Sequence, residues 1–188
     1  TMQVLISSAF LGSIPVNASI TGISFRLYDE AFTWPVEELS WENYDVQVSG
    51  SVNALGDLSE TFDENIGSDV VMARSGALSL TAESYPGGGS PNDFGVEIVF
   101  TNHYIYTGSD LLITIRHSGN GVSDEALEAT WEPGGYQVLT GDGYDAVTGS
   151  ANAFTISRIS YSTVPEPSFA LLAILALPVI AFRRSPRN

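Results

Sequence analysis

The chain contains neither cysteine nor lysine, and both absences restrict its chemistry. Without cysteine it forms no disulfide and carries no thiolate nucleophile, so an oxidising compartment would be tolerated but not exploited. Its 7 basic residues are therefore all arginines, against 22 acidic residues and a formal net charge of −15. A surface this acidic is expected to bind neither nucleic-acid phosphates nor anionic lipid headgroups.

Histidine is scarce, which limits acid–base and metal chemistry. The two histidines, His103 and His117, lack the spacing of a zinc site, and no nucleophile elbow accompanies them. Glycoside hydrolysis requires two carboxylates at a defined distance from each other. Among the scattered acids such a pair would arise only by chance, because no predicted strand carries a cluster of inward-facing carboxylates. We therefore expect no enzymatic activity.

Long helical patterns are missing from residues 1–163, where apolar side chains alternate with polar ones over short stretches. Such alternation predicts half-buried antiparallel strands. They are expected over 21–27, 44–48, 94–100 and 111–116, with further strands near 4–7, 70–74, 77–82, 136–139 and 153–162. Many short strands separated by turn residues predict an all-β fold, an antiparallel two-sheet sandwich of jelly-roll type.

Two local irregularities are expected within this pattern. After Ile156 the apolar positions shift from even to odd numbers, which predicts a β-bulge near Ser157 and Arg158. A short helix is expected over Leu58–Asn65, with Ser59 as its N-cap.

The three tryptophans are candidates for carbohydrate binding. Trp34 and Trp41 flank a proline-containing loop, and Trp131 precedes another proline. A flat, exposed indole stacks on a sugar ring, so we interpret these residues as ligand-binding candidates if their rings are exposed. The alternative is that the tryptophans fill the ends of the sandwich as part of its core.

Calcium is the metal that we expect if the chain binds one, because calcium prefers the loop carboxylates and carbonyls that this chain offers. Asp142 and Asp145 stand three residues apart in a glycine-rich loop, without the remaining acids of an EF-hand. The alternative is that both are turn-forming aspartates on an exposed loop. No other cofactor is expected.

The C-terminal segment differs from the rest of the chain. Residues 169–182 are apolar and uncharged, include Pro178, and precede Arg183 and Arg184. The run is shorter than the roughly 20 residues that usually span a bilayer. It could be a buried helix of the globular body, a permanent anchor or a removable signal, and the arginines favour an orientation that leaves the body outside the cytoplasm.

The order of features in this tail resembles the PEP-CTERM sorting signal of exported bacterial proteins. The box Val164-Pro165-Glu166-Pro167-Ser168, the apolar segment and the arginine cluster at Arg183 and Arg184 occur in the expected order. The resemblance implies an exosortase as membrane partner, transient insertion of residues 169–182 into the inner membrane, and delivery to the cell surface or an exopolysaccharide-rich extracellular matrix. It divides the chain into an ectodomain, residues 1–163, and a sorting signal, residues 164–188.

The stretches Ile20–Leu27, Leu58–Gly67 and Gly108–Arg116 are similar to uncharacterised ectodomains that commonly precede such tails. This second resemblance implies a β-sandwich and no activity. The expected function is that of an exported structural or adhesive protein, with a carbohydrate-binding module for exopolysaccharide and a calcium-dependent adhesive domain as alternatives. No N-terminal secretory signal is visible, and we expect that one has been removed or is missing.

Overall fold

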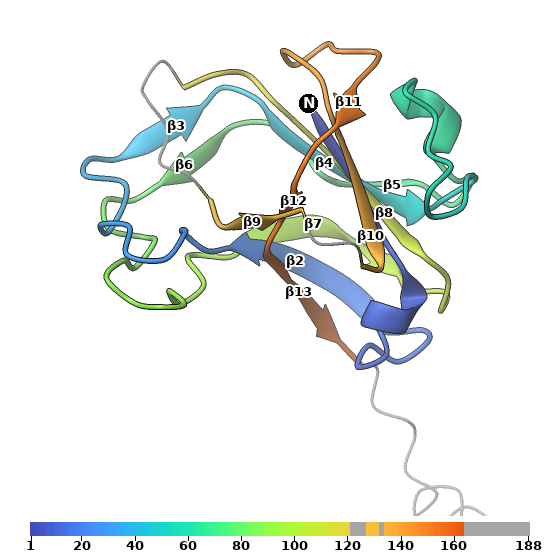
Figure 1. Ribbon diagram of the computed structural model, residues 1–188, viewed down its shortest axis with the longest axis horizontal. Helices are drawn as coiled ribbons and strands as arrows, with labels where there is room; N and C mark the ends of the chain where they lie inside the picture. The colour runs from blue at the N-terminus through green and yellow to red at the C-terminus, as the bar shows by residue number, and fades with distance from the viewer. Residues whose placement is uncertain (121–126, 132–133, 164–188) are drawn as a thin grey trace, which may run out of the picture.

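A computed structural model describes residues 1–120, 127–131 and 134–163, and these residues form antiparallel strands connected by turns and 3₁₀ helices (Figure 1). The largest sheet has the strand order β11-β10-β1-β8-β4-β5. In chain order its strands are β1 (Met2–Ile6), β4 (Tyr44–Gly50), β5 (Val71–Arg74), β8 (Leu111–His117), β10 (Tyr136–Thr140) and β11 (Ser150–Ala151). Strand β1 lies inside the sheet, where Val4 is paired with Ile113 of β8 and Val138 of β10.

A three-stranded sheet packs against the larger one and has the order β13-β2-β7. It consists of β2 (Ser19–Phe25), β7 (Ile98–Ile105) and β13 (Ser157–Ser162). Two further pairs join β3 (Leu39–Trp41) to β6 (Leu78–Leu80) and β9 (Ala129–Thr130) to β12 (Phe154–Thr155). The predicted all-β, antiparallel class is thereby confirmed.

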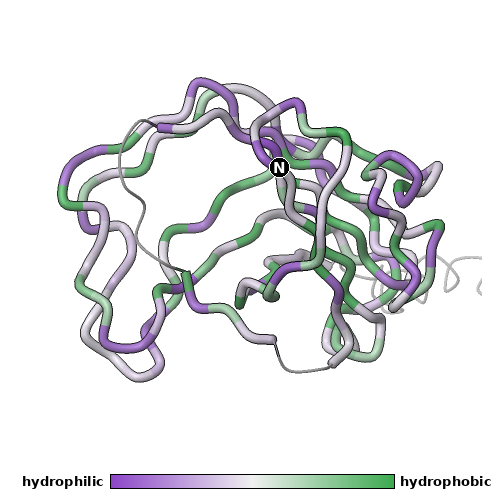
Figure 2. Tube along the Cα trace, turned by 45° about the horizontal axis from the view of Figure 1, so that its top comes forward, coloured by the Kyte–Doolittle hydropathy of each residue, from purple (hydrophilic) through white to green (hydrophobic). Residues whose placement is uncertain are grey.

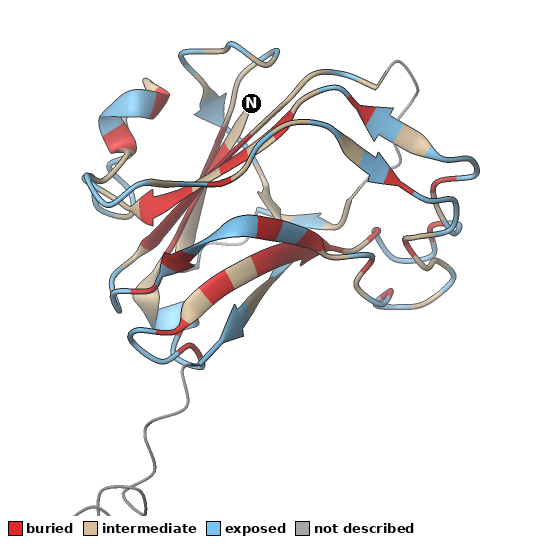
Figure 3. Cartoon of the chain, turned by 180° about the vertical axis from the view of Figure 1, so that it is seen from behind, coloured by how far each residue is buried: buried red, intermediate tan, exposed pale blue. Residues whose placement is uncertain are grey.

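The main core lies between the six-stranded and three-stranded sheets, and local alternation explains which side chains enter it. Tyr44, Val46 and Val48 are buried on β4, while the intervening positions are only half-buried. Ile23 and Phe25 of β2 are buried from the opposite side. Figure 2 shows hydrophobic and hydrophilic residues alternating along much of the trace, and Figure 3 shows buried residues concentrated on the central strands.

Strands β1 and β8 are buried on both faces, which the half-buried prediction did not anticipate. Leu112 and Thr114 are buried although they point away from the main core. The 3₁₀ helix η2 (Phe62–Asn65) covers this outer face, and its Phe62 is fully buried there. The outer face of the large sheet therefore has a second, smaller core.

The helix predicted over Leu58–Asn65 is wrong in length, because only the short η2 forms. Side chains form hydrogen bonds with backbone groups that the predicted helix would have included. The Ser59 hydroxyl accepts from the Thr61 N–H at 3.1 Å. The Asn65 side chain in turn accepts from the Ser59 N–H at 2.8 Å. Such local side-chain bonds compete with helical ones.

The predicted bulge near Ser157 and Arg158 is also misplaced. The ladder between β13 and β2 shifts register between Ser160 and Tyr161 instead. The change of apolar face after Ile156 has another cause, since this residue separates β12 from β13 and the two strands join different sheets.

The predicted tail, residues 164–188, lies outside the described residues. Within residues 1–120, 127–131 and 134–163, none of the helices has the length and apolar character needed to cross a bilayer.

Candidate functional site

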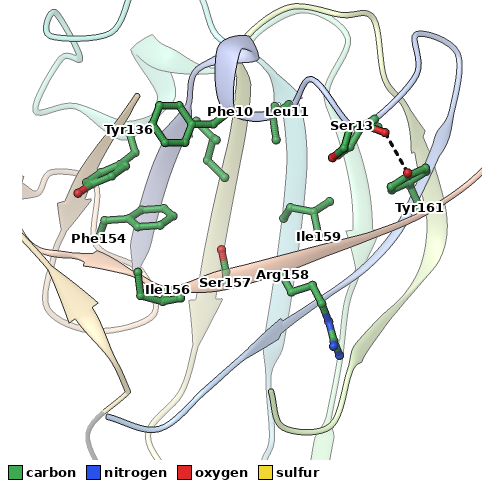
Figure 4. Close-up of a pocket in the computed structure, with 12 residues that line it drawn as sticks. Phe10, Leu11, Ser13, Tyr136, Phe154, Ile156, Ser157, Arg158, Ile159 and Tyr161 are labelled. Carbon is green, nitrogen blue, oxygen red and sulfur yellow. Dashed lines mark hydrogen bonds between the residues drawn. The ribbon is translucent and has the colours of Figure 1, made fainter. Parts of the chain in front are cut away.

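An apolar pocket of about 420 Å³ opens at one side of the layered body, between β10, β12 and β13 (Figure 4). Aromatic side chains from distant parts of the sequence line it. Tyr136 and Phe154 stack with ring centroids 4.2 Å apart and an interplanar angle of 24°. The complete lining is Ile6, Phe10, Leu11, Ser13, Ile14, Tyr136, Phe154, Ile156, Ser157, Arg158, Ile159 and Tyr161.

The pocket exists because the two main sheets are tied together at one side and separated at the other. At the tied side, β5 and β7 lie next to each other, and the Asn102 side chain donates to the Met72 carbonyl at 2.9 Å. At the other side β13 is an edge strand. Its outer backbone groups face no ladder partner among the described strands, and apolar side chains behind it stay accessible.

The 3₁₀ helix η1 (Ser8–Phe10) covers one end of the pocket and is held in place by Asp110, whose carboxylate accepts from the Ser8 N–H at 2.8 Å. Its last residue, Phe10, is 64% exposed. At the other end the Tyr161 hydroxyl donates to the Ser13 carbonyl at 2.9 Å, as Figure 4 shows. The result is an open apolar site that suits a hydrophobic or aromatic group.

Arg158 is the charged residue of the lining. Its guanidinium carbon lies 4.9 Å from the centroid of the Phe94 ring, an arrangement that favours a cation–π contact. Among the described residues it forms no ion pair, whereas Arg26 is paired with Glu128. Figure 4 shows the Arg158 side chain pointing away from the other lining residues, so its charge lies outside the apolar pocket.

The structure separates the three tryptophans. The expectation of an exposed ring is wrong for Trp41, which is 6% exposed and packs edge-to-face on Tyr44 with centroids 5.9 Å apart. Trp34 is half-buried and lies edge-to-face against Tyr85 at 5.6 Å. Trp131 is 72% exposed, so its indole alone has the accessibility that stacking on a sugar requires.

Asp142 and Asp145 both lie on an exposed loop after β10. The carbonyls on either side of Asp145 already have donors, because the Arg116 guanidinium donates to the carbonyls of Tyr144 at 3.2 Å and Ala146 at 2.6 Å. Among the described residues no group of three or more histidines, aspartates or glutamates gathers here or elsewhere to hold a metal ion. The positive charge at this loop is therefore that of the Arg116 guanidinium, a group of the protein itself.

The same loop carries one partner of a hydrogen-bonded pair of titratable groups, Tyr144 and Asp45. The Tyr144 hydroxyl donates to the Asp45 carboxylate, which raises the pKa of Tyr144. Burial acts to raise the pKa of Asp45, but hydrogen bonds from Tyr144 and the Gly76 N–H outweigh it and lower that pKa. Elsewhere, burial raises the pKa of Tyr85 to about 12. We therefore interpret the shifted pKa values of Tyr144 and Asp45 as the result of a structural hydrogen bond, and that of Tyr85 as the result of burial.

The histidines are also apart. His117 stacks on Tyr44 with centroids 5.5 Å apart, and His103 is exposed on β7. The sorting residues, from Val164 to Ser168 with Arg183 and Arg184, lie outside the described residues.

Sequence reasoning missed the apolar pocket, whose aromatic residues come from four separate segments of the chain. An exposed phenylalanine such as Phe10 has no sequence signal that distinguishes it from a core phenylalanine.

No family model matches the chain, and neither the curated proteins nor the solved structures contain a match.

Proposed function

We propose that the chain is a non-enzymatic, exported protein of structural or adhesive type, sorted to the cell surface by its C-terminal segment. The observation that carries this proposal is the order of box, apolar run and arginines over residues 164–188. The proposal includes an exosortase-type processing enzyme as partner. It also includes the finer architecture of a jelly-roll-like, two-sheet sandwich followed by a hydrophobic helix.

The position of the last strand supports removal of the tail. Strand β13 ends at Ser162, and the box begins at Val164. Cleavage within or after the box would thus release the segment at 169–182 while leaving every described strand intact.

The first prediction concerns the mass of the mature protein. Protein isolated from the surface of the native cells is expected to lack residues beyond the box, because the apolar segment acts as a signal and not as a lasting span. Intact-mass spectrometry measures this directly. In the matched variant Glu166→Ala with Pro167→Ala, the mass should include residues up to Asn188. A native mass that ends at Asn188 would overturn the processing proposal and leave a membrane anchor.

A second candidate function, carbohydrate binding, is favoured by the exposure of Trp131. The ring lies directly after β9 and is accessible for stacking on a sugar. Neither Trp34 nor Trp41 offers a comparable exposed face.

On a polysaccharide array, Trp131→Ala is expected to weaken binding at least tenfold, or about 1.4 kcal/mol. The matched control is Phe32→Ala, which removes an even more exposed ring from a different loop and should leave sugar binding unchanged. Equal binding by Trp131→Ala and the parent chain would exclude this function. Binding that disappears in EDTA would instead support the calcium-dependent adhesive alternative at Asp142 and Asp145.

A further inference from the structure

Two of the four arginines that the structure describes lie against one phenyl ring. The guanidinium carbons of Arg158 and Arg26 are 4.9 and 5.5 Å from the centroid of the Phe94 ring. Like charges repel each other. Two guanidinium groups at one ring therefore need negative charge close by.

The ring and the two arginines lie on the outer face of the three-stranded sheet. Arg158 of β13 is the ladder partner of Ser24 on β2, and directly paired residues share a face. The neighbours of Ser24 along β2, Ile23 and Phe25, belong to the main core, so Ser24 and Arg158 point outward. Figure 4 agrees, because its Arg158 side chain points away from the apolar pocket.

The fold neutralises only one of the two guanidinium groups. Arg26 is paired with Glu128, and both side chains are largely buried. Arg158 is exposed and has no such partner among the described residues. The carboxylate of Glu97 lies over Gly22 on the same face, but it is not within ion-pair distance of Arg158. Arg158 is therefore open to an anion from outside the chain.

Hydroxyl groups lie beside this guanidinium. The Ser24 hydroxyl is buried on the same face and has no hydrogen-bond partner among the described residues. Ser160 is two positions along β13 from Arg158 and is paired with Gly22, so its side chain shares that face. The surface thus combines one unpaired guanidinium with serine hydroxyls, which suits a ligand that carries both a carboxylate and hydroxyl groups.

A sugar acid has this combination of groups. A guanidinium stacked on an aromatic ring keeps its N–H edges for a planar oxyanion, which it binds through two parallel hydrogen bonds. A single carboxylate matches the single unneutralised charge. The acids elsewhere on the chain oppose it little, because salt screens charges beyond about 8 Å at physiological ionic strength.

We propose that the outer face of the β13-β2-β7 sheet binds a uronate unit of an acidic polysaccharide, with Arg158 holding the uronate carboxylate. The site is separate from Trp131, and it requires neither export nor processing of the tail. It gives an acidic protein a local, charge-selective contact with an acidic polymer.

Titration of the full-length chain with two matched ligands tests this proposal. One is a tetramer of galacturonate, and the other is the methyl ester of the same tetramer, which has the same sugar rings without the charge. The parent chain is expected to bind the acidic tetramer at least about tenfold more tightly than the ester. Arg158→Gln should abolish this preference. Arg158→Lys should restore only part of it, because an ammonium group cannot form the bidentate pair.

The matched control for the change in net charge is Val147→Glu, at a 69% exposed position outside this face. It lowers the net charge by the same amount as Arg158→Gln and should change the preference by less than about twofold, because its charge is screened. Near-ultraviolet circular dichroism checks that the variants are folded. Equal affinities of the parent chain for the two tetramers, or a preference that survives Arg158→Gln, would overturn the proposal. Equally tight binding of a hexaglutamate peptide would also overturn it, since carboxylates without sugar hydroxyls would then suffice.

Discussion

Replacing Asn65 by alanine is expected to lower the free energy of unfolding by about 3 kcal/mol, because it leaves several buried polar groups without partners. Asn65, the last residue of η2, is fully buried. Its amide nitrogen donates to the Gln3 side-chain oxygen and the Ser59 carbonyl, both at 2.8 Å. Its oxygen accepts from the Asn53 side chain and the Ser59 N–H, also at 2.8 Å.

The Gln3 side chain extends this network into the large sheet. Its amide nitrogen donates to the Phe62 carbonyl at 3.1 Å and to the Thr114 hydroxyl at 2.9 Å. Removing Asn65 thus affects β1, β8 and the segment that covers them. For a domain of this size, a loss of 3 kcal/mol corresponds to a decrease in Tm of roughly 6–12 °C.

Urea unfolding followed by circular dichroism measures the effect of Asn65→Ala. Asn152→Ala is the matched control, because its side chain is exposed, donates to the Thr140 hydroxyl and accepts from the N–H of the neighbouring Ala153. It should cost about 0.5 kcal/mol or less. A double-mutant cycle with Gln3→Leu and Asn65→Leu should show coupling, since the double variant leaves fewer orphaned groups than the two single variants added together. Equal losses for Asn65→Ala and Asn152→Ala would contradict the importance of this network.

Gly87→Ala is expected to destabilise the protein by about 3 kcal/mol, for a steric reason. A Cβ atom at position 87 would lie 2.3 Å from the Ala31 carbonyl oxygen and 2.4 Å from backbone atoms of Phe32 and Thr33. Backbone atoms cannot move aside as a flexible side chain can. Overpacking usually costs 1–3 kcal/mol, and this site belongs at the upper end of that range.

The control for Gly87→Ala is Gly12→Ala, where the nearest atom to the added methyl group is 3.9 Å away. Its effect on the free energy of unfolding should stay within about 0.5 kcal/mol. Thermal unfolding of both variants gives the comparison. If both changes had the same small effect, the close approach of the two loops would not exist in solution.

The strands that were predicted best are those whose burial is decided by alternation along one segment. Tyr44, Val46 and Val48 follow this rule, since the main core covers only one side of β4. Leu112 and Thr114 do not, because η2, which lies some fifty residues earlier in the chain, covers their face of β8. Alternation reports the surroundings of one strand, and it contains no information about a distant segment that folds over the other face.

The candidate site was less predictable than the fold. Trp41 and Trp131 are the same residue type near turns, yet one packs beside Tyr44 and the other remains exposed. The apolar pocket depends on an unpaired sheet edge and on the position of η1, and neither feature follows from local spacing. By contrast, the tail hypothesis came entirely from contiguous sequence and stays a prediction.

The position of β1 has a consequence for the order in which the fold can form. Its ladder partners are β8 and β10, which begin at Leu111 and Tyr136. In a chain that emerges in N-to-C order, this apolar strand therefore stays unpaired until β8 and β10 have followed it. Pairing between segments so distant in sequence is slow. The large sheet is therefore completed late, once the residues of β10 are available.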